Sequence, residues 1–290
     1  MEERIAKRKS TSTVRALLRI SDSKTRAFRR TIWSFWRKNR RDFPWRTTRD
    51  PYAILVSEVM LQQTQTDRVV PKFGAFLKTF PTVRALARAS LGDVLKAWQG
   101  LGYNRRARML HACARELVER HAGVVPEDPE ILTQLSGVGP YTARAVCVFA
   151  FQQAHPMIET NIRRVYMHHF FSGRMGVPDR ELLPVIEQTM STRRPHEWFA
   201  ALMDYGAFLA RSIDNPNKRS AGYVIQKPFR GSLREMRGKI LRLMTERRSL
   251  SIQALHHELN DHMHMHFTRA LSALQQEGFI KRIKNSIVLT

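Results

Sequence analysis

A pair of glycines constrains the fold of this chain more than any other feature of its sequence. Gly137 and Gly139, in the segment LSGVGPYTARAV at 135–146, stand one residue apart and directly before an apolar helical pattern. Glycine lets the backbone turn tightly enough to expose consecutive amide N–H groups, and a helix that starts just beyond the turn adds the positive end of its dipole. The segment therefore predicts a hairpin between two helices that holds a phosphate without reading a base.

Helical periodicity continues through most of the chain, and strand signals are scarce before residue 279. Loops between the periodic segments are short, as in a compact helical body. The sequence therefore predicts an all-α protein. The expected helices cover residues 25–38, 52–63, 66–79, 82–88, 91–98, 104–120, 128–134, 140–151, 160–171, 179–191 and 195–210.

Two segments interrupt this pattern and define the expected domains. Residues 1–27 are predicted to be a basic N-terminal tail, and residues 212–232, rich in prolines, glycines and polar side chains, a linker. The helical domain between them covers 28–211.

A separate small domain is expected beyond the linker. Residues 233–247, 249–259 and 263–277 predict short helices, and FIKRIKNSIVLT alternates like a hairpin around Lys284 and Asn285. This pattern predicts a winged helix-turn-helix-like domain over 233–290, a type of module that binds DNA or docks on proteins; an unrelated helical appendage is the alternative. The histidines of HMHMH at 262–266 are expected in a solvated turn rather than at a metal.

Strong basicity indicates a polyanionic partner. The chain carries 49 Lys and Arg against 25 Asp and Glu, a net charge of +24. Residues 1–50 alone hold 16 Lys and Arg against 5 Asp and Glu, and such clustering is typical of proteins that bind nucleic acid. A merely basic surface is the alternative, because charge says nothing about specificity.

Apolar segments point to neither a membrane nor a secretory pathway. No apolar run approaches the roughly 18 residues that cross a bilayer, and residues 1–30 lack the apolar centre of a secretory signal. Cys113 and Cys147 lie in apolar helical patterns and are expected in the core. We therefore expect a reducing, cytoplasmic compartment in which the protein is associated with DNA.

Glu58 is a candidate catalytic acid. It lies among Ile54, Leu55, Val59 and Leu61 in a helix that is otherwise mostly apolar. A carboxyl group buried there tends to keep its proton near neutrality, and it can then donate that proton to a leaving group. The alternative is a buried glutamate paired with an arginine.

Glu159 is a candidate anion. It begins a predicted helix, where the helix dipole favours the ionised carboxylate, and Arg163 follows one turn later. A helix-capping or salt-bridged surface glutamate is the alternative. Two carboxylates whose surroundings favour opposite protonation states suggest a proton donor and an anion, the pair that glycosidic bond cleavage uses.

Five motifs in order carry a resemblance to a known family. They are FPWR at 43–46, SEVMLQQTQ at 57–65, GLGY at 100–103, LSGVGPYTA at 135–143 and ETNIRRV at 159–165. Over residues 28–210 the chain resembles the helix-hairpin-helix (HhH-GPD) DNA glycosylases, and among them the MutY-like adenine glycosylases. The resemblance implies two helical subdomains and a target base flipped out of the DNA.

Site residues follow from this resemblance. Glu58 matches the general acid that protonates adenine, and Glu159 the acidic residue that stabilises the sugar cation and helps deliver water. Tyr141 stands where bifunctional relatives hold a lysine nucleophile; tyrosine cannot form that Schiff base, so a monofunctional enzyme is expected. Trp45 and Arg46 are expected at the base pocket, with a place in the buried scaffold as the alternative for Trp45. The residues expected to bind DNA are Gln62, Gln63, Arg105, Gly137, Gly139, Thr142, Asn161 and Arg163.

The chain departs from the family's pattern in three respects. Glu159 stands where the family usually has aspartate, which displaces the carboxylate by roughly a bond length. Residues 207–230 lack the cysteines of the family's iron–sulfur cluster, and the chain has only two cysteines, so no cofactor and no metal are expected. The β-rich domain that inspects 8-oxoguanine is replaced by the winged-helix-like segment.

The resemblance thus implies a monofunctional DNA glycosylase. We expect it to remove a flipped, mispaired base from double-stranded DNA in base excision repair, most plainly adenine opposite guanine or 8-oxoguanine, and to act as a monomer. A glycosylase for mismatched thymine or uracil, or for damaged purines, is the enzymatic alternative. A DNA-binding regulator without catalysis is the alternative from another class.

Overall fold

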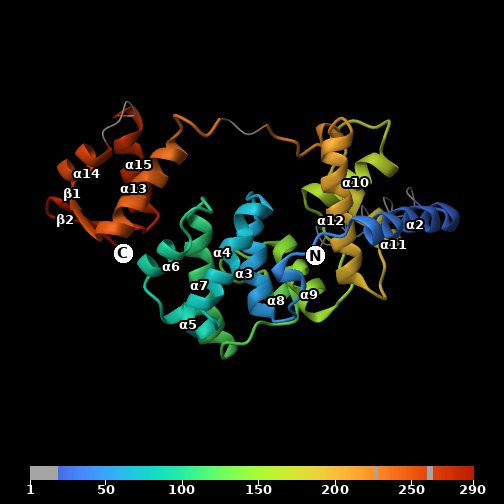
Figure 1. The fold of residues 1–290 in the computed structure, drawn as a ribbon, viewed down its shortest axis with the longest axis horizontal. Helices are drawn as coiled ribbons and strands as arrows, with labels where there is room; N and C mark the ends of the chain where they lie inside the picture. The colour runs from blue at the N-terminus through green and yellow to red at the C-terminus, as the bar shows by residue number, and fades with distance from the viewer. Residues whose placement is uncertain (1–18, 226–227, 260–263) are drawn as a thin grey trace, which may run out of the picture. The chain divides into compact units, whose positions relative to one another are not determined.

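The computed structural model describes residues 19–225, 228–259 and 264–290 and confirms a mostly helical chain (Figure 1). The described residues divide into two compact units. Unit 1 contains the residues up to Pro51, Glu127–Pro129 and Gly139–Ile225, and unit 2 contains Tyr52–Pro126, Glu130–Val138 and the residues after Ile225.

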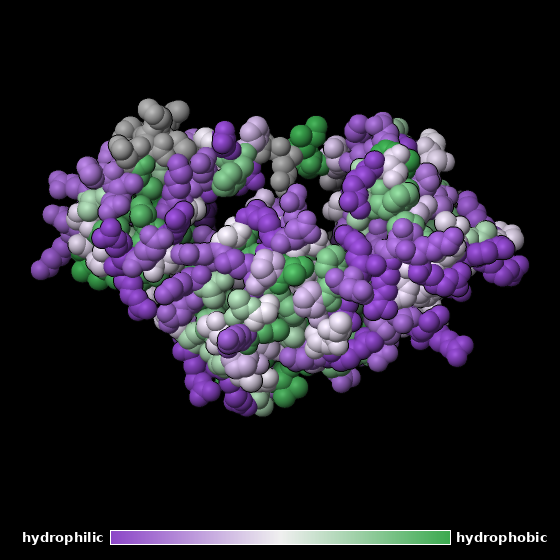
Figure 2. Space-filling view, viewed as in Figure 1, coloured by the Kyte–Doolittle hydropathy of each residue, from purple (hydrophilic) through white to green (hydrophobic). Residues whose placement is uncertain are grey.

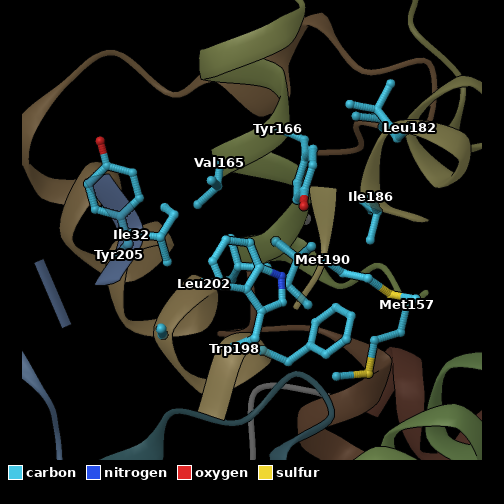
Figure 3. Close-up of a cluster of buried hydrophobic side chains, with 14 of the residues drawn as sticks. Ile32, Met157, Val165, Tyr166, Leu182, Ile186, Met190, Trp198, Leu202 and Tyr205 are labelled. Atoms are coloured by element: carbon cyan, nitrogen blue, oxygen red, sulfur yellow. The ribbon is translucent and has the colours of Figure 1, made fainter. Parts of the chain in front are cut away.

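Unit 1 is built from long helices around an aromatic core. Its elements are α2 (Asp22–Asn39), η1 (Pro44–Arg46), α9 (Pro140–Phe151), α10 (Thr160–Phe170), α11 (Asp179–Thr189), α12 (Pro195–Ser212) and η2 (Pro216–Arg219). Trp198 of α12 is fully buried in the middle of this core, among side chains from α2, α10 and α11 (Figure 3). Phe28 of α2 meets the rings of Tyr166 and Trp198 edge to face, at centroid distances of 5.3 and 5.8 Å. The apolar stripe of the predicted first helix therefore faces the core of unit 1.

Unit 2 combines the remaining helices of the predicted glycosylase domain with the C-terminal segment. Its elements are α3 (Pro51–Leu61), α4 (Thr66–Thr79), α5 (Val83–Arg88), α6 (Leu91–Ala97), α7 (Arg105–His121), α8 (Pro129–Leu132), α13 (Leu233–Arg247), β1 (Ser249–Ser251), α14 (Ile252–Leu259), α15 (His264–Gln276), β2 (Ile280–Ile283) and β3 (Ser286–Leu289). Ser and Thr side chains cap several of these helices: Thr82 accepts from the amide of Ala85 before α5, and Ser90 from that of Asp93 before α6.

The C-terminal segment combines the helices α13, α14 and α15 with a three-stranded sheet. β2 and β3 form an antiparallel hairpin around Lys284 and Asn285, as expected, and β1 pairs with the other edge of β3 to give the strand order β1-β3-β2. Residues 249–251, predicted to begin a helix, are instead a strand. The prediction failed there because pairing with β3, which is distant in sequence, decides the conformation of this short segment.

Other predicted boundaries also shift. Helix α2 begins at Asp22 because Ser21 accepts a hydrogen bond from the amide of Lys24, so the end of the predicted tail at residue 27 is helical. The predicted linker starts with packed structure: Val177 and Ser220 form a parallel β-bridge. Part of the HMHMH segment lies outside the described residues.

Hydrophilic residues cover most of the face seen in Figure 2, in line with the net charge of +24. Among the described residues, no helix has the length and apolar character that a membrane crossing requires.

Candidate nucleic-acid interface and catalytic residues

The glycine hairpin before α9 has the predicted geometry. Gly137 has a φ of +76°, in the left-handed region, and a Cβ at this position would lie 2.6 Å from the Cβ of Met109. Gly139 is the N-cap of α9, and Pro140 occupies the first turn. Both glycines are exposed. The turn therefore presents its backbone to solvent at a helix N-terminus, which is an anion-binding arrangement.

Glu116 of α7 holds the hairpin in place. Its carboxylate accepts from the amide of Ser136 at 2.8 Å and from the hydroxyl of the same residue at 2.5 Å. Together with the close approach of Met109, these contacts fix the residue before Gly137 against α7. This contact was not predicted, because Glu116 lies 20 residues away from Ser136 and local sequence does not indicate the pairing.

Glu58 lies inside the apolar helix α3, as predicted. Its side chain is buried, and it is one of few charged groups in the described core. The C-terminal end of this helix is held by Arg106, whose guanidinium donates to the carbonyl oxygens of Val59 at 2.7 Å and Met60 at 2.8 Å. Burial lowers the pKa of Arg106 to about 10. These hydrogen bonds position the helix that carries Glu58.

Four of the predicted DNA-binding residues lie together in unit 2. Gln62, Gln63, Arg105 and Gly137 all line one cavity of about 920 Å³. Gln63 follows α3 with a φ of +55°, so the chain turns sharply just beyond the helix. The cavity therefore joins the end of α3, the start of α7 and the hairpin.

Glu159 is the N-cap of α10 in unit 1. One oxygen of its carboxylate accepts from the amides of Asn161 and Ile162, both at 2.8 Å, and the other lies 3.3 Å from Asn161 Nδ2. This is the capping geometry that we considered as the alternative, and it fixes the orientation of the carboxylate. The two roles are compatible, because capping leaves the second oxygen with lone pairs to spare.

The electrostatic surroundings of Glu159 differ from the expectation. Burial raises the pKa of this carboxyl group, and the two amide hydrogen bonds and the charges of Arg164 and Arg163 only partly oppose that effect. Arg163 was expected to favour the anion directly, but it makes a bidentate ion pair with Asp179 at 2.9 and 2.6 Å. The prediction that the helix terminus and Arg163 would dominate is wrong, because removal of the carboxylate from water has the larger effect.

A second arginine, Arg164, holds Asn161 in position beside Glu159, a contact that was not predicted from the sequence. It is buried and donates to Asn161 Oδ1 at 2.8 Å and to the carbonyl oxygen of Gly206 at 2.9 Å. Gly206 permits the contact between α12 and α10, since a Cβ there would lie 2.3 Å from the carbonyl oxygen of Asn161. Asn161 is thus held on both sides, next to Glu159.

Arg46, predicted at the base pocket, is an element of a buried ion pair. Its guanidinium donates to both oxygens of Asp204, at 2.8 and 2.9 Å, and Arg41 binds the same carboxylate at 2.7 Å. Trp45 is buried, and Phe43 stacks on it with ring centroids 4.9 Å apart. These contacts give the FPWR motif a structural role in unit 1, and a pocket role for it stays a prediction.

Tyr141 and Thr142, in the first turn of α9, are wholly or partly withdrawn from solvent. Tyr141 is partly buried and packs against the core of unit 1, and Thr142 is buried. A contact of the Thr142 side chain with DNA therefore has little support from its position. Its backbone amide, in the first turn of α9, keeps the place predicted for a phosphate contact.

The donor set of this chain does not fit an iron–sulfur cluster. Such a cluster needs four thiolates, and the chain contains two cysteines. Cys113 belongs to unit 2 and Cys147 to unit 1, and burial raises the pKa of their thiols to about 12 and about 11 respectively. Both behave as small core residues, as predicted.

Protein hydrogen bonds hold the segment that follows α12. Asn217 is buried and donates from Nδ2 to the carbonyl oxygen of Thr160 at 2.9 Å, and Arg219 donates to that of Met167 at 3.1 Å. The amide of Val177 donates to Arg219 at 3.1 Å, within the parallel bridge. The segment is thereby attached to α10, the helix that Glu159 caps.

Comparison with known proteins agrees with this arrangement. Residues 56–181 match the family described as "HhH-GPD superfamily base excision DNA repair protein". The chain is 38% identical over 231 residues to the adenine DNA glycosylase of Mycobacterium tuberculosis, covering 72% of this chain and 76% of that protein. It is 37% identical over 193 residues to the adenine DNA glycosylase of Homo sapiens, covering 62% of this chain and 35% of that protein.

A solved structure extends the likeness to three dimensions. A thermostable thymine-DNA glycosylase superposes with a TM-score of 0.60 at 28% identity, covering 68% of this chain and 93% of that one. An endonuclease III in a complex with DNA shares the fold, with a TM-score of 0.53 at 19% identity, over 64% of this chain and 85% of that one. The chain belongs to the adenine DNA glycosylase family within the HhH-GPD superfamily.

Proposed function

We propose that this protein is a monofunctional adenine DNA glycosylase of base excision repair. The observation that carries the proposal is the presence of two carboxyl groups withdrawn from water, Glu58 buried within α3 and Glu159 partly buried at the start of α10, where burial raises its pKa. They stand on a chain that is 38% identical to an adenine DNA glycosylase. The substrate is double-stranded DNA with adenine opposite guanine or 8-oxoguanine. The protein binds it as a monomer and is located with the DNA in the cell.

The reaction breaks the bond between C1′ of the deoxyribose and N9 of a flipped adenine. Glu58 donates a proton to the adenine ring, so that the base departs as a neutral molecule. Glu159 stabilises the positive charge that develops on the sugar and accepts a proton from the water that attacks C1′. The hydroxide of the water becomes bonded to C1′, and the product is an abasic site. Glu159 gains one proton from water while Glu58 loses one to adenine, so the total number of protons on the two carboxyl groups does not change.

Preorganisation by the protein supports the role of Glu159. The two amide hydrogen bonds hold its carboxylate in one orientation before DNA binds, so no reorganisation is needed as the sugar cation forms. The exposed amides of the hairpin and the N-terminus of α9 supply a phosphate contact that does not depend on base sequence.

An excision assay with a panel of duplexes tests the proposal. Duplexes carrying A:8-oxoguanine, A:G, A:C, T:G, U:G and an alkylated purine are incubated with the protein and then treated with alkali to cleave abasic sites. We expect product from adenine mispairs, and its loss in Glu58→Gln and Glu159→Gln. Glu119→Gln is the matched control, because Glu119 is exposed on α7 and the charge change is the same.

Each other outcome identifies an alternative. Product only from T:G or U:G would indicate a pyrimidine mismatch glycosylase, for which the similarity to a thymine-DNA glycosylase offers a precedent. Product only from the alkylated purine would indicate a damaged-base enzyme. Absence of product from every duplex, with DNA binding intact, would indicate a regulator.

A further inference from the structure

The C-terminal module, residues 233–290, is attached to the rest of unit 2 through α13 and β3. Thr245 of α13 accepts a hydrogen bond from Gln99 at 2.6 Å. A Cβ at Gly92 in α6 would lie 2.9 Å from the side chain of Leu289 in β3. The exposed face of α15 and the turn of the β2–β3 hairpin take no part in these contacts.

The basic residues of α13 are largely paired with carboxylates. The pairs are Arg237 with Glu277 at 2.7 Å, Lys239 with Glu235 at 3.6 Å, Arg242 with Glu246 at 3.3 Å, Arg247 with Glu258 at 3.2 Å and, directly after the helix, Arg248 with Asp93 of α6 at 3.2 Å. Charges of both signs are thus interspersed on the outer surface of this helix, as is typical of a solvated helix face.

The basic residues of α15 and of the β2–β3 hairpin lack such partners. Arg269, Lys281, Arg282 and Lys284 are all exposed, and none of them forms an ion pair within the described part of the chain. Neither α15 nor the segment from Ile280 to Leu289 contains an Asp or Glu. Because uncompensated charges repel one another in a folded protein, this cluster indicates a partner of opposite charge.

The exposed face of α15 lies opposite the face that enters the core. Phe267, Ala270 and Leu274 are buried. The exposed side chains are those of Thr268, Arg269, Ser272, Gln275 and Gln276. At 3.6 residues per turn, they cover about 120° of the circumference of the helix. Hydroxyl, amide and guanidinium groups bind base edges and phosphates, and an α-helix fits the major groove of B-DNA.

The hairpin leaves α15 at a fixed angle. Gly278 ends the helix with a φ of +71°, and the amide of Phe279 donates to the carbonyl oxygen of Leu274 at 2.9 Å. The ring of Phe279 is fully buried, so the start of β2 is anchored in the core of the module. α15 and the hairpin lie with α13 at the C-terminal end of the chain (Figure 1), and helix and hairpin are held as one surface.

The turn of the hairpin presents positive charge at its tip. Lys284 has a φ of +53°, in the left-handed region that lysine rarely adopts. Nε of Arg282 donates to the carbonyl oxygen of Lys284 at 3.2 Å, which supports the turn and leaves both positive charges unbalanced. Ile283, between them, is 56% exposed. A backbone conformation that costs free energy at an exposed tip points to a role for the side chains around it.

We propose that the C-terminal module binds double-stranded DNA, with the exposed face of α15 in the major groove and Lys281, Arg282 and Lys284 on phosphate oxygens. The proposal goes beyond the proposed function, because it gives the module a contact with duplex DNA that requires neither a mispair nor excision. Most of this contact is independent of base sequence, since phosphate contacts do not read bases.

Titration of a fluorescent duplex without a mispair tests the proposal. The full chain is titrated at several salt concentrations, and binding is followed by fluorescence anisotropy. The triple variant Lys281→Gln, Arg282→Gln and Lys284→Gln should raise the Kd by on the order of 10–100-fold and reduce the slope of log Kd against log salt by about 2–3, because each lost phosphate contact removes about 0.9 from that slope. Ser272→Glu should also raise the Kd, because it places a negative charge in the middle of the exposed face of α15 and leaves the hairpin intact.

Variants with the same change in net charge are the controls. Lys239→Gln, Arg242→Gln and Arg247→Gln together remove three cations that are paired with carboxylates, and Arg242→Gln alone matches the charge change of Ser272→Glu. The triple control should leave the salt slope within about 1 of the wild-type value. Equal effects of the two triple variants would overturn the proposal, because net charge rather than the surface of α15 and the hairpin would then govern binding.

Further readouts keep the outcomes distinct. Thermal unfolding shows whether the triple hairpin variant is folded, since Arg282 supports the turn, and Ser272→Glu, at an exposed helix position, supplies the answer if it is not. A wild-type Kd in both variants would overturn the proposal and indicate an acidic protein as the partner of this surface. Absence of excision from mispaired duplexes would defeat the proposed function and leave the result with the unmispaired duplex unaffected.

Discussion

Glu159 combines a structural and a chemical task, and two substitutions at this position separate them. Glutamine keeps a side-chain oxygen that can accept from the amides of Asn161 and Ile162, which lie at 2.8 Å, but removes the charge. Alanine removes both. Loss of an N-cap side chain costs about 0.5–2 kcal/mol, so Glu159→Ala should lower the free energy of unfolding by that amount. Glu159→Gln should leave it unchanged or raise it, because burial disfavours the ionised carboxylate.

Activity should follow charge rather than capping. Both variants should reduce single-turnover excision by on the order of 10²–10⁴-fold, the usual effect of losing a positioned acid–base group. The assay is alkali-revealed cleavage of an adenine-mispaired duplex at saturating protein, beside urea unfolding of each protein. Retention of more than a tenth of the wild-type rate by Glu159→Gln would refute the reasoning, because capping would then be the only role of the side chain.

The dependence on pH has a definite sign. Burial raises the pKa of Glu159 above the ordinary value of 4.5, so the folded protein binds this proton more tightly than the unfolded chain does. Between 4.5 and the raised pKa, this residue therefore makes the folded state less stable as pH rises. Excision should fall as pH decreases through the same raised pKa, because the anion is lost. Glu159→Gln should remove this contribution to the pH dependence of stability, and an unaltered profile would contradict the assignment.

Three further predictions concern the surrounding structure. Gly137→Ala should destabilise the protein by about 1–3 kcal/mol and weaken DNA binding, because φ is +76° and the new Cβ would collide with Met109; urea unfolding and DNA titration measure both, and a wild-type Kd would contradict the role of the hairpin. Asp204→Asn should cost about 3 kcal/mol in urea unfolding, because it removes the buried carboxylate that balances the charge of Arg46, whose side chain is only 13% exposed; a loss below 1 kcal/mol would show that the ion pair is dispensable. Borohydride added during turnover should trap no protein–DNA adduct, since Tyr141 cannot form a Schiff base; an adduct would show that another amine acts as nucleophile.

Much of the fold followed from local sequence. Apolar periodicity located the long helices to within a few residues, since helix formation and burial of one face are local properties. The strand β1 was missed because Ser249–Ser251 is too short to carry a period and gains its conformation from pairing with β3. The N-terminal boundary moved to Asp22 because Ser21 caps α2, a signal that is present in the sequence.

The candidate site was predictable in its residue types but not in its partners. Glu58 could be recognised because a carboxylate within an apolar helix is unusual, and it is buried as expected. The partners of the arginines were not recognisable: Arg46 meets Asp204, which is 158 residues away, and Arg163 meets Asp179 in place of Glu159. Such pairings depend on how helices pack, and local sequence does not encode them. The burial that raises the pKa of Glu159 is a property of the same kind.

The attachment of the C-terminal module, residues 233–290, to α6 has a practical consequence for shortened proteins. Deletion of everything after residue 232 would uncover Gln99, which donates to Thr245 at 2.6 Å, and the part of α6 around Gly92, where the side chain of Leu289 packs. Such a protein should lose heat resistance together with any contribution of the module to catalysis, and the two losses would be indistinguishable. Single substitutions that preserve these contacts are therefore needed to measure what residues 233–290 contribute to activity.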